Sequence, residues 1–246
     1  MPNLFSCNYL ARKPIELAMK EFAGNFDKNQ KVLDVGCGKK PYAKFFSCEY
    51  IGLDPYKEVA PEIVANAWEI PLPDNSVDGI VLNQSLEHIA QTEKTISEIK
   101  RVLKLNGIGI VTVPQTMKNH SMPILSEKIK LNNFDKNEIK FFSVDYYRFT
   151  KFGLIYLFKD FKIISLKETS GYFSTIFQLI NYFFSSFGIK VIFMPIFFFN
   201  NLMGIVSDSL FNILGSLNID ALQRFKHLIY DSLTLNYILI IKNDKK

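Results

Sequence analysis

Apolar and polar positions along the first half of the chain predict strands and helices in turn. Short apolar or β-branched runs, the expected strands, occupy residues 32–35, 50–53, 63–65, 79–82 and 108–113. Helical spacing precedes the first run, with one apolar face made of Ile15, Ala18, Met19 and Phe22. A later helix would place Ile96, Ile99 and Leu103 on one face, and Asn106-Gly107 predicts its end. Continuous apolar strands separated by helices indicate an α/β domain whose mostly parallel sheet is covered on both faces.

The second half of the chain is less regular. Residues 115–144 are polar and lack a steady period, and such a long segment is typically a lid or a substrate loop. Thr150 is a candidate N-cap for a short helix that runs to Phe158. Residues 161–167 and 236–242 then read as strands. We therefore expect one domain, made of residues 1–168 and 235–246, with an insertion at 169–234.

The insertion is apolar and amphipathic. One expected helical face carries Tyr172, Phe173, Ile176, Phe177, Ile180, Phe183, Phe184 and Phe187, and the other carries Ser174, Thr175, Gln178, Asn181 and Ser185. Residues 169–189 contain no charge, a length that would suit a membrane span, but the continuous polar face disfavours a true span. Two other interpretations stay open. In the first, residues 172–217 lie on a membrane surface or cover a lipid-like substrate. In the second, they form a helical cap or a homodimer interface, which would bury a stripe made of Leu202, Val206, Leu210, Ile213 and Leu217.

Composition and charge narrow the class of protein modestly. The 246 residues carry a formal net charge of +5 without a dense basic stripe, which disfavours nucleic acid as a partner. The three cysteines and three histidines show no metal-ligand spacing, so we expect neither a disulfide framework nor a bound metal. The first residues lack the apolar core of a signal peptide, and we expect a cytoplasmic protein.

The stretch KVLDVGCGKKPY, residues 31–42, is the first candidate site. An apolar strand runs into Gly36 and Gly38, which would leave main-chain N–H groups open to a ligand. Asp34 ends this strand and Asp54 ends the next, where an acid in such folds binds ribose hydroxyls. Pro41 stands where a dinucleotide fingerprint has its third glycine, and no P-loop ending follows. The pattern favours an adenosine-type ligand, against the alternative that the glycine turn serves packing alone.

Two further stretches carry a family resemblance. Residues 65–89, ANAWEIPLPDNSVDGIVLNQSLEHI, and 98–114, EIKRVLKLNGIGIVTVP, resemble the class I S-adenosylmethionine-dependent methyltransferases, in the branch with Leu-Glu-His and Arg-Val-Leu-Lys segments. DYYRFTKFG, residues 145–153, is similar to a subgroup associated with cell-envelope and surface-polysaccharide gene neighbourhoods, which carries Lys-Lys-Pro-Tyr after the glycines. The resemblance implies a Rossmann-like, seven-stranded, mostly parallel sheet with an antiparallel last strand. The apolar helical insertion would then lie between the last two strands.

The resemblance also implies positions for the cofactor, S-adenosyl-L-methionine. Asp34, Gly36 and Gly38 would surround its methionine part, with Lys39 or Lys40 in place of the family's third glycine. Asp54 would bind the ribose hydroxyls. Adenine would lie near Asn66, Ala67 and Trp68, and Asn83 would lie near the cofactor's amino group.

Catalytic residues are less well marked. By resemblance, His88 lies at the same mouth, either as a general base or as a local structural residue. Tyr146 and Arg148, with Tyr147 between them, are either substrate-contacting residues or a packed aromatic pair beside a surface arginine. Methyl transfer from a sulfonium depends mainly on alignment of the acceptor, so a catalytic triad is not required.

The expected activity is S-adenosylmethionine-dependent methyl transfer at the inner face of the membrane. The expected acceptor is a small molecule, a glycan or a lipid-linked sugar. The rival interpretation is a non-catalytic module, in which a methyltransferase fold is retained for membrane or partner binding.

Overall fold

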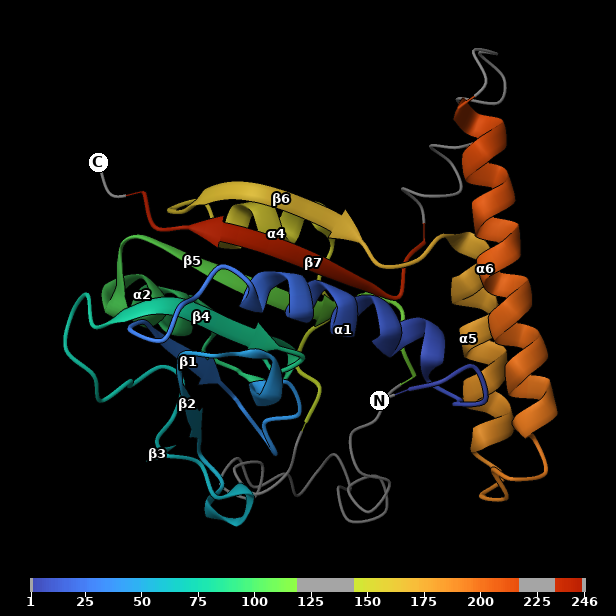
Figure 1. The fold of residues 1–246 in the computed structure, drawn as a ribbon, viewed down its shortest axis with the longest axis horizontal. Coiled ribbons are helices and arrows are strands. Elements are labelled where there is room, and N and C mark those ends of the chain that lie inside the picture. The colour runs from blue at the N-terminus through green and yellow to red at the C-terminus, as the bar shows by residue number, and fades with distance from the viewer. Residues whose placement is uncertain (1, 119–143, 217–232, 245–246) are drawn as a thin grey trace, which may run out of the picture.

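A seven-stranded sheet forms the centre of the computed structural model, which describes residues 2–118, 144–216 and 233–244 (Figure 1). The strand order is β3-β2-β1-β4-β5-β7-β6. The strands span Lys31–Val35 (β1), Glu49–Asp54 (β2), Ile63–Val64 (β3), Val77–Asn83 (β4), Leu103–Pro114 (β5), Lys162–Glu168 (β6) and Asn236–Lys242 (β7). Most of the expected loop 115–144 lies outside the described residues.

The pairing of the strands confirms the predicted architecture. The strands β1 to β5 pair in parallel, and β7 pairs antiparallel with both β5 and β6. The insertion lies between β6 and β7, as expected. Since β1, β2, β4 and β5 are parallel, the residues that follow them all meet at one edge of the sheet. In α/β folds, ligands bind at this edge of the sheet.

Helices cover both faces of the sheet. The α-helices α1 (Tyr9–Ala23), α2 (Thr92–Val102) and α4 (Lys151–Leu157) are accompanied by short 3₁₀ turns at Ala43–Phe45, Lys57–Val59 and Leu86–His88. Alternation along β1 sends Val32 to the α1 side and Leu33 to the other, and both are fully buried. The predicted face of α1 packs there, with Ile15, Met19 and Phe22 buried.

The predicted cap and short helix near residue 150 are present. Thr150 has an extended backbone, and its hydroxyl accepts a hydrogen bond from the Gly153 N–H. The helix α4 then runs to Leu157 and leads directly into β6.

The expected helix stop at Asn106-Gly107 is wrong. The helix α2 ends at Val102, and Leu103 already belongs to β5, where it pairs with Val77. The N–H groups of Asn75 and Ser76 donate to the carbonyls of Arg101 and Val102, so the helix end is satisfied from outside. Asn106 has a left-handed φ of 66° within a strand, in the stretch where the β4–β5 register shifts.

Two long helices, α5 (Tyr172–Ser185) and α6 (Met194–Ser216), form a hairpin beside the sheet. Figure 1 shows it standing across the right-hand end of the sheet, next to the start of α1. Its polar face points inward: Thr175, Gln178 and Asn181 are completely buried. The hairpin is therefore held to the rest of the chain by polar contacts.

The buried polar groups of the hairpin are hydrogen-bonded to one another and to the N-terminal segment. Asn181 accepts from Asn200 and donates to Asn201, both at 2.9 Å. Asn201 in turn donates to the carbonyls of Leu4 and Ser6. Asp208 accepts from the N–H groups of Gly171, Phe173 and Ser174 and so satisfies the start of α5.

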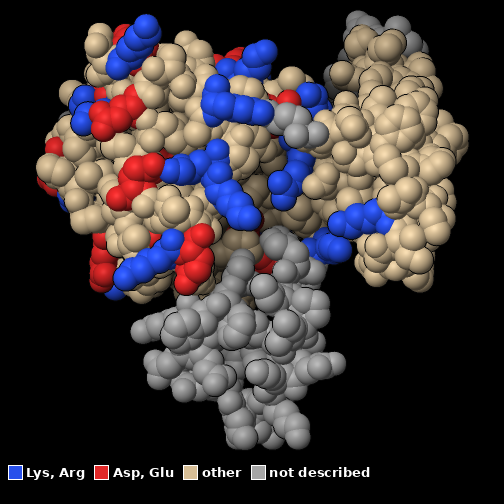
Figure 2. Space-filling view, turned by 60° about the horizontal axis from the view of Figure 1, so that its bottom comes forward, with Lys and Arg blue, Asp and Glu red and all other residues tan. Residues whose placement is uncertain are grey.

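The apolar face of the hairpin is left on the surface. Phe183 is 61% exposed and Ile213 is 63% exposed, and Leu202, Val206 and Leu210 of the expected buried stripe are also exposed. Leu217 lies outside the described residues. Lys190 and Asp208 are the only charged residues between 169 and 216. Figure 2 shows the result, an almost uncharged hairpin beside a sheet domain that carries many charges.

Candidate functional site

The glycine turn is fixed to the end of the neighbouring strand. The N–H groups of Gly36 and Cys37 donate to the Leu53 carbonyl at 2.8 and 3.1 Å, and the Gly38 N–H donates to Asp54 Oδ2 at 3.0 Å. The φ angles of Gly36 and Gly38 are +71° and +49°. Both glycines therefore have backbone conformations that other residues adopt only at a cost.

The two glycines differ in what surrounds them. A Cβ on Gly36 would lie 2.6 Å from the Cβ of Ser85, whereas a Cβ on Gly38 would have no atom of the described residues within 4 Å apart from its two chain neighbours. Gly36 thus permits packing of the β1 turn on the β4 turn, where the Ser85 hydroxyl donates to the Val35 carbonyl at 2.9 Å. Among the described residues beyond its chain neighbours, none crowds Gly38, which makes it the glycine that a ligand could approach.

The two lysines after the glycines have different surroundings. Lys40 has a left-handed φ of 50°, the conformation that a glycine at this place would adopt without strain. Its amine forms an ion pair with Glu62, whose other carboxylate oxygen accepts from the Gly52 N–H at 2.7 Å. Lys39 is exposed to solvent. Lys40 therefore takes the backbone conformation of a glycine while its amine is engaged by Glu62.

Two carboxylates lie at the strand ends beside this turn. Asp34 is 4% exposed and accepts a hydrogen bond from the Tyr50 hydroxyl at 2.6 Å. Burial raises the pKa of Asp34 to about 7, against the lowering effect of the Tyr50 bond, and the nearby charge of Asp54 adds to the rise. Asp54 is also buried and accepts from the Tyr56 N–H at 3.0 Å. A cationic ligand would relieve the repulsion between these two groups.

The residues expected near adenine follow the short strand β3. Ala67 is buried, and Trp68 is half-buried and packs against the main core cluster. Asn66 is half-buried, and its backbone carbonyl accepts from the Glu69 N–H at 3.1 Å. The indole of Trp68 thus contributes to core packing, and its contact with adenine stays a prediction.

Asn83 ends β4 at the same edge of the sheet. Its Oδ1 accepts from the Thr112 hydroxyl at 2.8 Å, and Gln84, which follows, has a left-handed φ of 49°. Both residues line a cleft of about 270 Å³ that also reaches Pro41 and Tyr42 after the glycine turn. A larger hollow of about 460 Å³ lies between α2 and α4, lined by Glu93 and other residues that are not at this edge.

His88 is placed next to residues that the sequence did not single out. Its Nδ1 lies 3.1 Å from the Val144 carbonyl and 3.2 Å from Asp145 Oδ1, so one ring nitrogen is engaged locally. Its Nε2 lies 3.8 Å from Glu87 Oε1. Glu87 is fully buried, and burial, together with the charge of Asp145, raises its pKa to about 8.

Glu87 and Asp145 are therefore the site-edge acids that sequence reasoning missed. The only signals were the Glu of the Leu-Glu-His segment and the Asp that opens 145–153. Neither residue could be recognised as buried from the sequence.

The segment 145–148 is held against the same turn. The N–H groups of Tyr146 and Tyr147 donate to the Glu87 carbonyl at 2.8 and 3.3 Å, and Arg148 pairs with Asp145 at 2.7 Å. Tyr146 is 40% exposed. Burial, then the charge of Asp54 and the phenol of Tyr146, raise the pKa of Tyr56, which places Tyr146 near the Asp54 end of the site.

Comparison with known proteins agrees with this geometry. Residues 33–111 match the family model described as "Methyltransferase domain". This region contains the glycine turn, Asp34, Asp54, Asn83 and the Leu-Glu-His segment. Together with the sheet order, the match indicates a Rossmann-like fold with a methyltransferase domain over these residues.

Individual relatives point to the same class. A demethylmenaquinone methyltransferase of Symbiobacterium thermophilum is 37% identical over 57 residues, which cover 23% of each chain. A probable S-adenosylmethionine-dependent methyltransferase of Mycobacterium tuberculosis is 35% identical over 97 residues, covering 34% of this chain and 35% of the relative. The chain thus spans only a minor part of the length of either relative.

A solved structure shows the fold on a larger scale. The phosphoethanolamine N-methyltransferase 2 of Haemonchus contortus, in complex with S-adenosyl-L-methionine, superimposes with a TM-score of 0.52 at 14% identity. The superposition covers 94% of this chain and 52% of that chain. At this identity the likeness concerns the fold.

Proposed function

We propose that this protein is an S-adenosylmethionine-dependent methyltransferase that acts on a small-molecule, glycan or lipid-linked acceptor at the cytoplasmic face of a membrane. The observation that carries the enzymatic part is the pairing of an open glycine turn with two buried carboxylates at one sheet edge. Apart from its chain neighbours, no described residue crowds Gly38, and its N–H donates to Asp54. The family match over 33–111 supports the same assignment.

The residues present fit the cofactor. Asp54 has carboxylate oxygens suited to ribose hydroxyls, and Asp34 lies where a positive charge would be favoured. S-adenosyl-L-methionine supplies an activated methyl group on a sulfonium. The protein's own task is then to bind the acceptor in line with that group and to exclude competing water.

The membrane part of the proposal rests on the hairpin. A helix pair in a soluble protein normally buries its apolar face, whereas here the polar faces of α5 and α6 are inside and the apolar faces outside. This arrangement suits lipid as the occupant, because the buried asparagines and Asp208 are hydrogen-bonded within the protein. Among residues 169–216, the only exposed charge is Lys190, which lies in the turn between the two helices. Among the described helices, α6 is the one that is long and apolar enough to cross a membrane by length and composition.

Calorimetric titration with S-adenosylmethionine and S-adenosylhomocysteine tests the enzymatic part. We expect both to bind, and we expect Asp54→Asn to weaken binding by about tenfold or more, since charge-assisted hydrogen bonds to the ribose are lost. Asp160→Asn is the matched control, because Asp160 is exposed in the turn between α4 and β6 and its substitution should leave the affinity within about twofold.

The outcome separates the two interpretations of the fold. A folded protein that binds neither ligand would contradict the proposal. Binding without methyl transfer to any small-molecule, glycan or lipid-linked acceptor would favour the non-catalytic module.

A further inference from the structure

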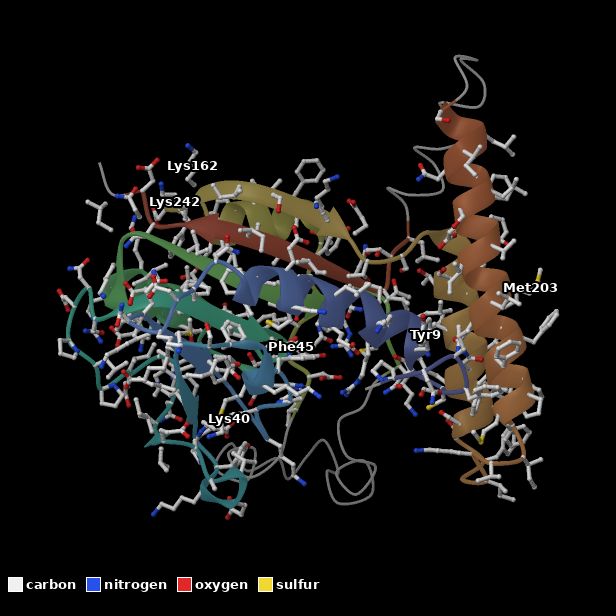
Figure 3. The ribbon with its side chains drawn as sticks, viewed as in Figure 1. Tyr9, Lys40, Phe45, Lys162, Met203 and Lys242 are labelled. Atoms are coloured by element: carbon white, nitrogen blue, oxygen red, sulfur yellow. The ribbon has the colours of Figure 1, made fainter. Side chains whose placement is uncertain are left out.

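The cleft beside Asn83 and Gln84 is closed by residues far from them in sequence. Arg12 of α1, Lys118 after β5 and Tyr182 of α5 line it together with Tyr42 of the glycine turn. The cleft therefore joins the edge of the proposed cofactor site to the inner face of the hairpin. Figure 3 shows Tyr9, at the start of α1, lying against the hairpin, while Met203 on α6 lies on the outer side.

The described lining of the cleft is positively charged. Two of its lining residues, Arg12 and Lys118, are cationic, and none of them is acidic. The Arg12 side chain is exposed and has no hydrogen bond or ion pair with any described residue. The Lys118 amine lies 5.7 Å from the centre of the Tyr182 ring, so it is held over this wall of the cleft.

Tyr182 gives the cleft a buried donor. The residue is 7% exposed, and its hydroxyl has no hydrogen-bond partner among the described residues. A buried hydroxyl without a partner costs free energy, which a bound acceptor oxygen would recover. Burial raises the pKa of Tyr42 and of Tyr182, and the charge of Arg12 opposes the rise at both, in agreement with the three residues lining one cleft.

We infer that this cleft is the acceptor subsite for an oxyanion, a phosphate or carboxylate group carried by the molecule to be methylated. The inference rests on the proposed function and adds the chemical class of the acceptor. An arginine fork, a lysine and a buried phenol O–H are all donors, and together they match the oxygens of such a group. The adjoining apolar hairpin suits an acceptor that also carries an alkyl chain.

Titration of the full chain, saturated with S-adenosylhomocysteine, tests the subsite with three probes: inorganic phosphate, hexyl phosphate and the uncharged hexyl glucoside. We expect hexyl phosphate to bind and hexyl glucoside not to bind. Arg12→Gln should weaken hexyl phosphate about tenfold, because a charge-assisted bond is lost. Lys20→Gln, which removes an exposed charge from the same helix, should change the affinity less than about twofold.

Tyr182→Phe keeps the inference testable if Arg12→Gln were to disturb the fold. It removes only a hydroxyl that has no described partner, so the protein should remain folded, and hexyl phosphate should bind several-fold more weakly. Equal affinity for hexyl phosphate and hexyl glucoside would overturn the subsite. So would an affinity for hexyl phosphate that neither Arg12→Gln nor Tyr182→Phe changes.

The probes also distinguish an amphiphilic acceptor from a soluble one, and they distinguish failure of the subsite from failure of the proposed methyl transfer. Tighter binding of hexyl phosphate than of inorganic phosphate identifies an amphiphilic acceptor, and equal binding identifies a soluble one. Both results support the oxyanion subsite. Arg12-dependent binding of hexyl phosphate without any binding of S-adenosylhomocysteine would uphold the subsite and contradict methyl transfer.

Discussion

At the scale of single residues, Glu87 is the acid whose burial is least compensated. Neither of its carboxyl oxygens has a hydrogen-bond partner among the described residues, and its pKa is raised from 4.5 to about 8. The folded protein therefore binds a proton that the unfolded chain has released between these two pH values. Through this group, the free energy of unfolding falls as the pH rises from about 4.5 to 8.

Replacement of Glu87 by glutamine should remove this dependence. We expect Glu87→Gln to gain stability relative to wild type between pH 5 and pH 9, by on the order of 3 kcal/mol, because the amide cannot ionise. Urea unfolding at the two pH values measures the difference. Glu58→Gln, at an exposed position, should show no such gain. A constant difference between wild type and Glu87→Gln across this range would contradict the raised pKa.

At the scale of elements, the hairpin depends on its inner amides. Asn181 is bonded to both Asn200 and Asn201, so Asn181→Leu leaves two buried amides short of a partner. We expect a loss of about 2–3 kcal/mol in the free energy of unfolding. Asn212→Leu, on the exposed side of α6, is the matched control and should change stability by less than about 0.5 kcal/mol. Equal effects of the two substitutions, measured by urea unfolding, would show that the inner amides do not hold the hairpin.

The elements also show what the sequence could predict. The strands were predictable because they are short apolar or β-branched runs, and α1 was predictable because the helical spacing of its apolar residues sets which side chains face the core. The helix stop at Asn106-Gly107 was misplaced because pairing of Leu103 with Val77 ends α2 earlier. For α5 the two faces were predictable, but a pattern of faces does not state which one points inward. That choice comes from partners far away in the chain, such as the Cys7 carbonyl and the Ala11 N–H, which are hydrogen-bonded to Gln178 of α5.

The candidate site likewise contains residues that the sequence predicts and residues that it does not. Asp34 and Asp54 could be found from sequence, since each ends a strand and parallel strands end at one edge. The cleft could not be found, because Arg12 and Tyr182 come from helices separated by most of the chain. Burial of Glu87 likewise arises from packing of 144–148 over the turn after β4.

At the scale of the whole molecule, the sheet domain and the hairpin present different surfaces. On the face shown in Figure 2, charged side chains are spread over the sheet domain, few lie on the hairpin, and Lys and Arg side chains lie where the two meet. The outer side of the hairpin exposes apolar residues such as Phe183, Val206 and Ile213. A membrane contact through the hairpin would place the cleft, which lies between the hairpin and the sheet edge, close to the lipid surface. An amphiphilic acceptor could then reach the cleft without leaving the membrane.

Vesicle co-sedimentation tests this arrangement. The double substitution Val206→Asp and Leu210→Asp puts two charges on the outer side of α6, where both residues are about half exposed. We expect binding to vesicles that contain anionic lipid to fall by more than about tenfold, because buried apolar area is lost and two carboxylates oppose insertion. Phe152→Asp is the control, since Phe152 is 78% exposed on α4, away from the hairpin. If the wild type were instead a dimer that the double substitution converts to a monomer, with vesicle binding unchanged, the outer face would be a subunit interface and the membrane proposal would be wrong.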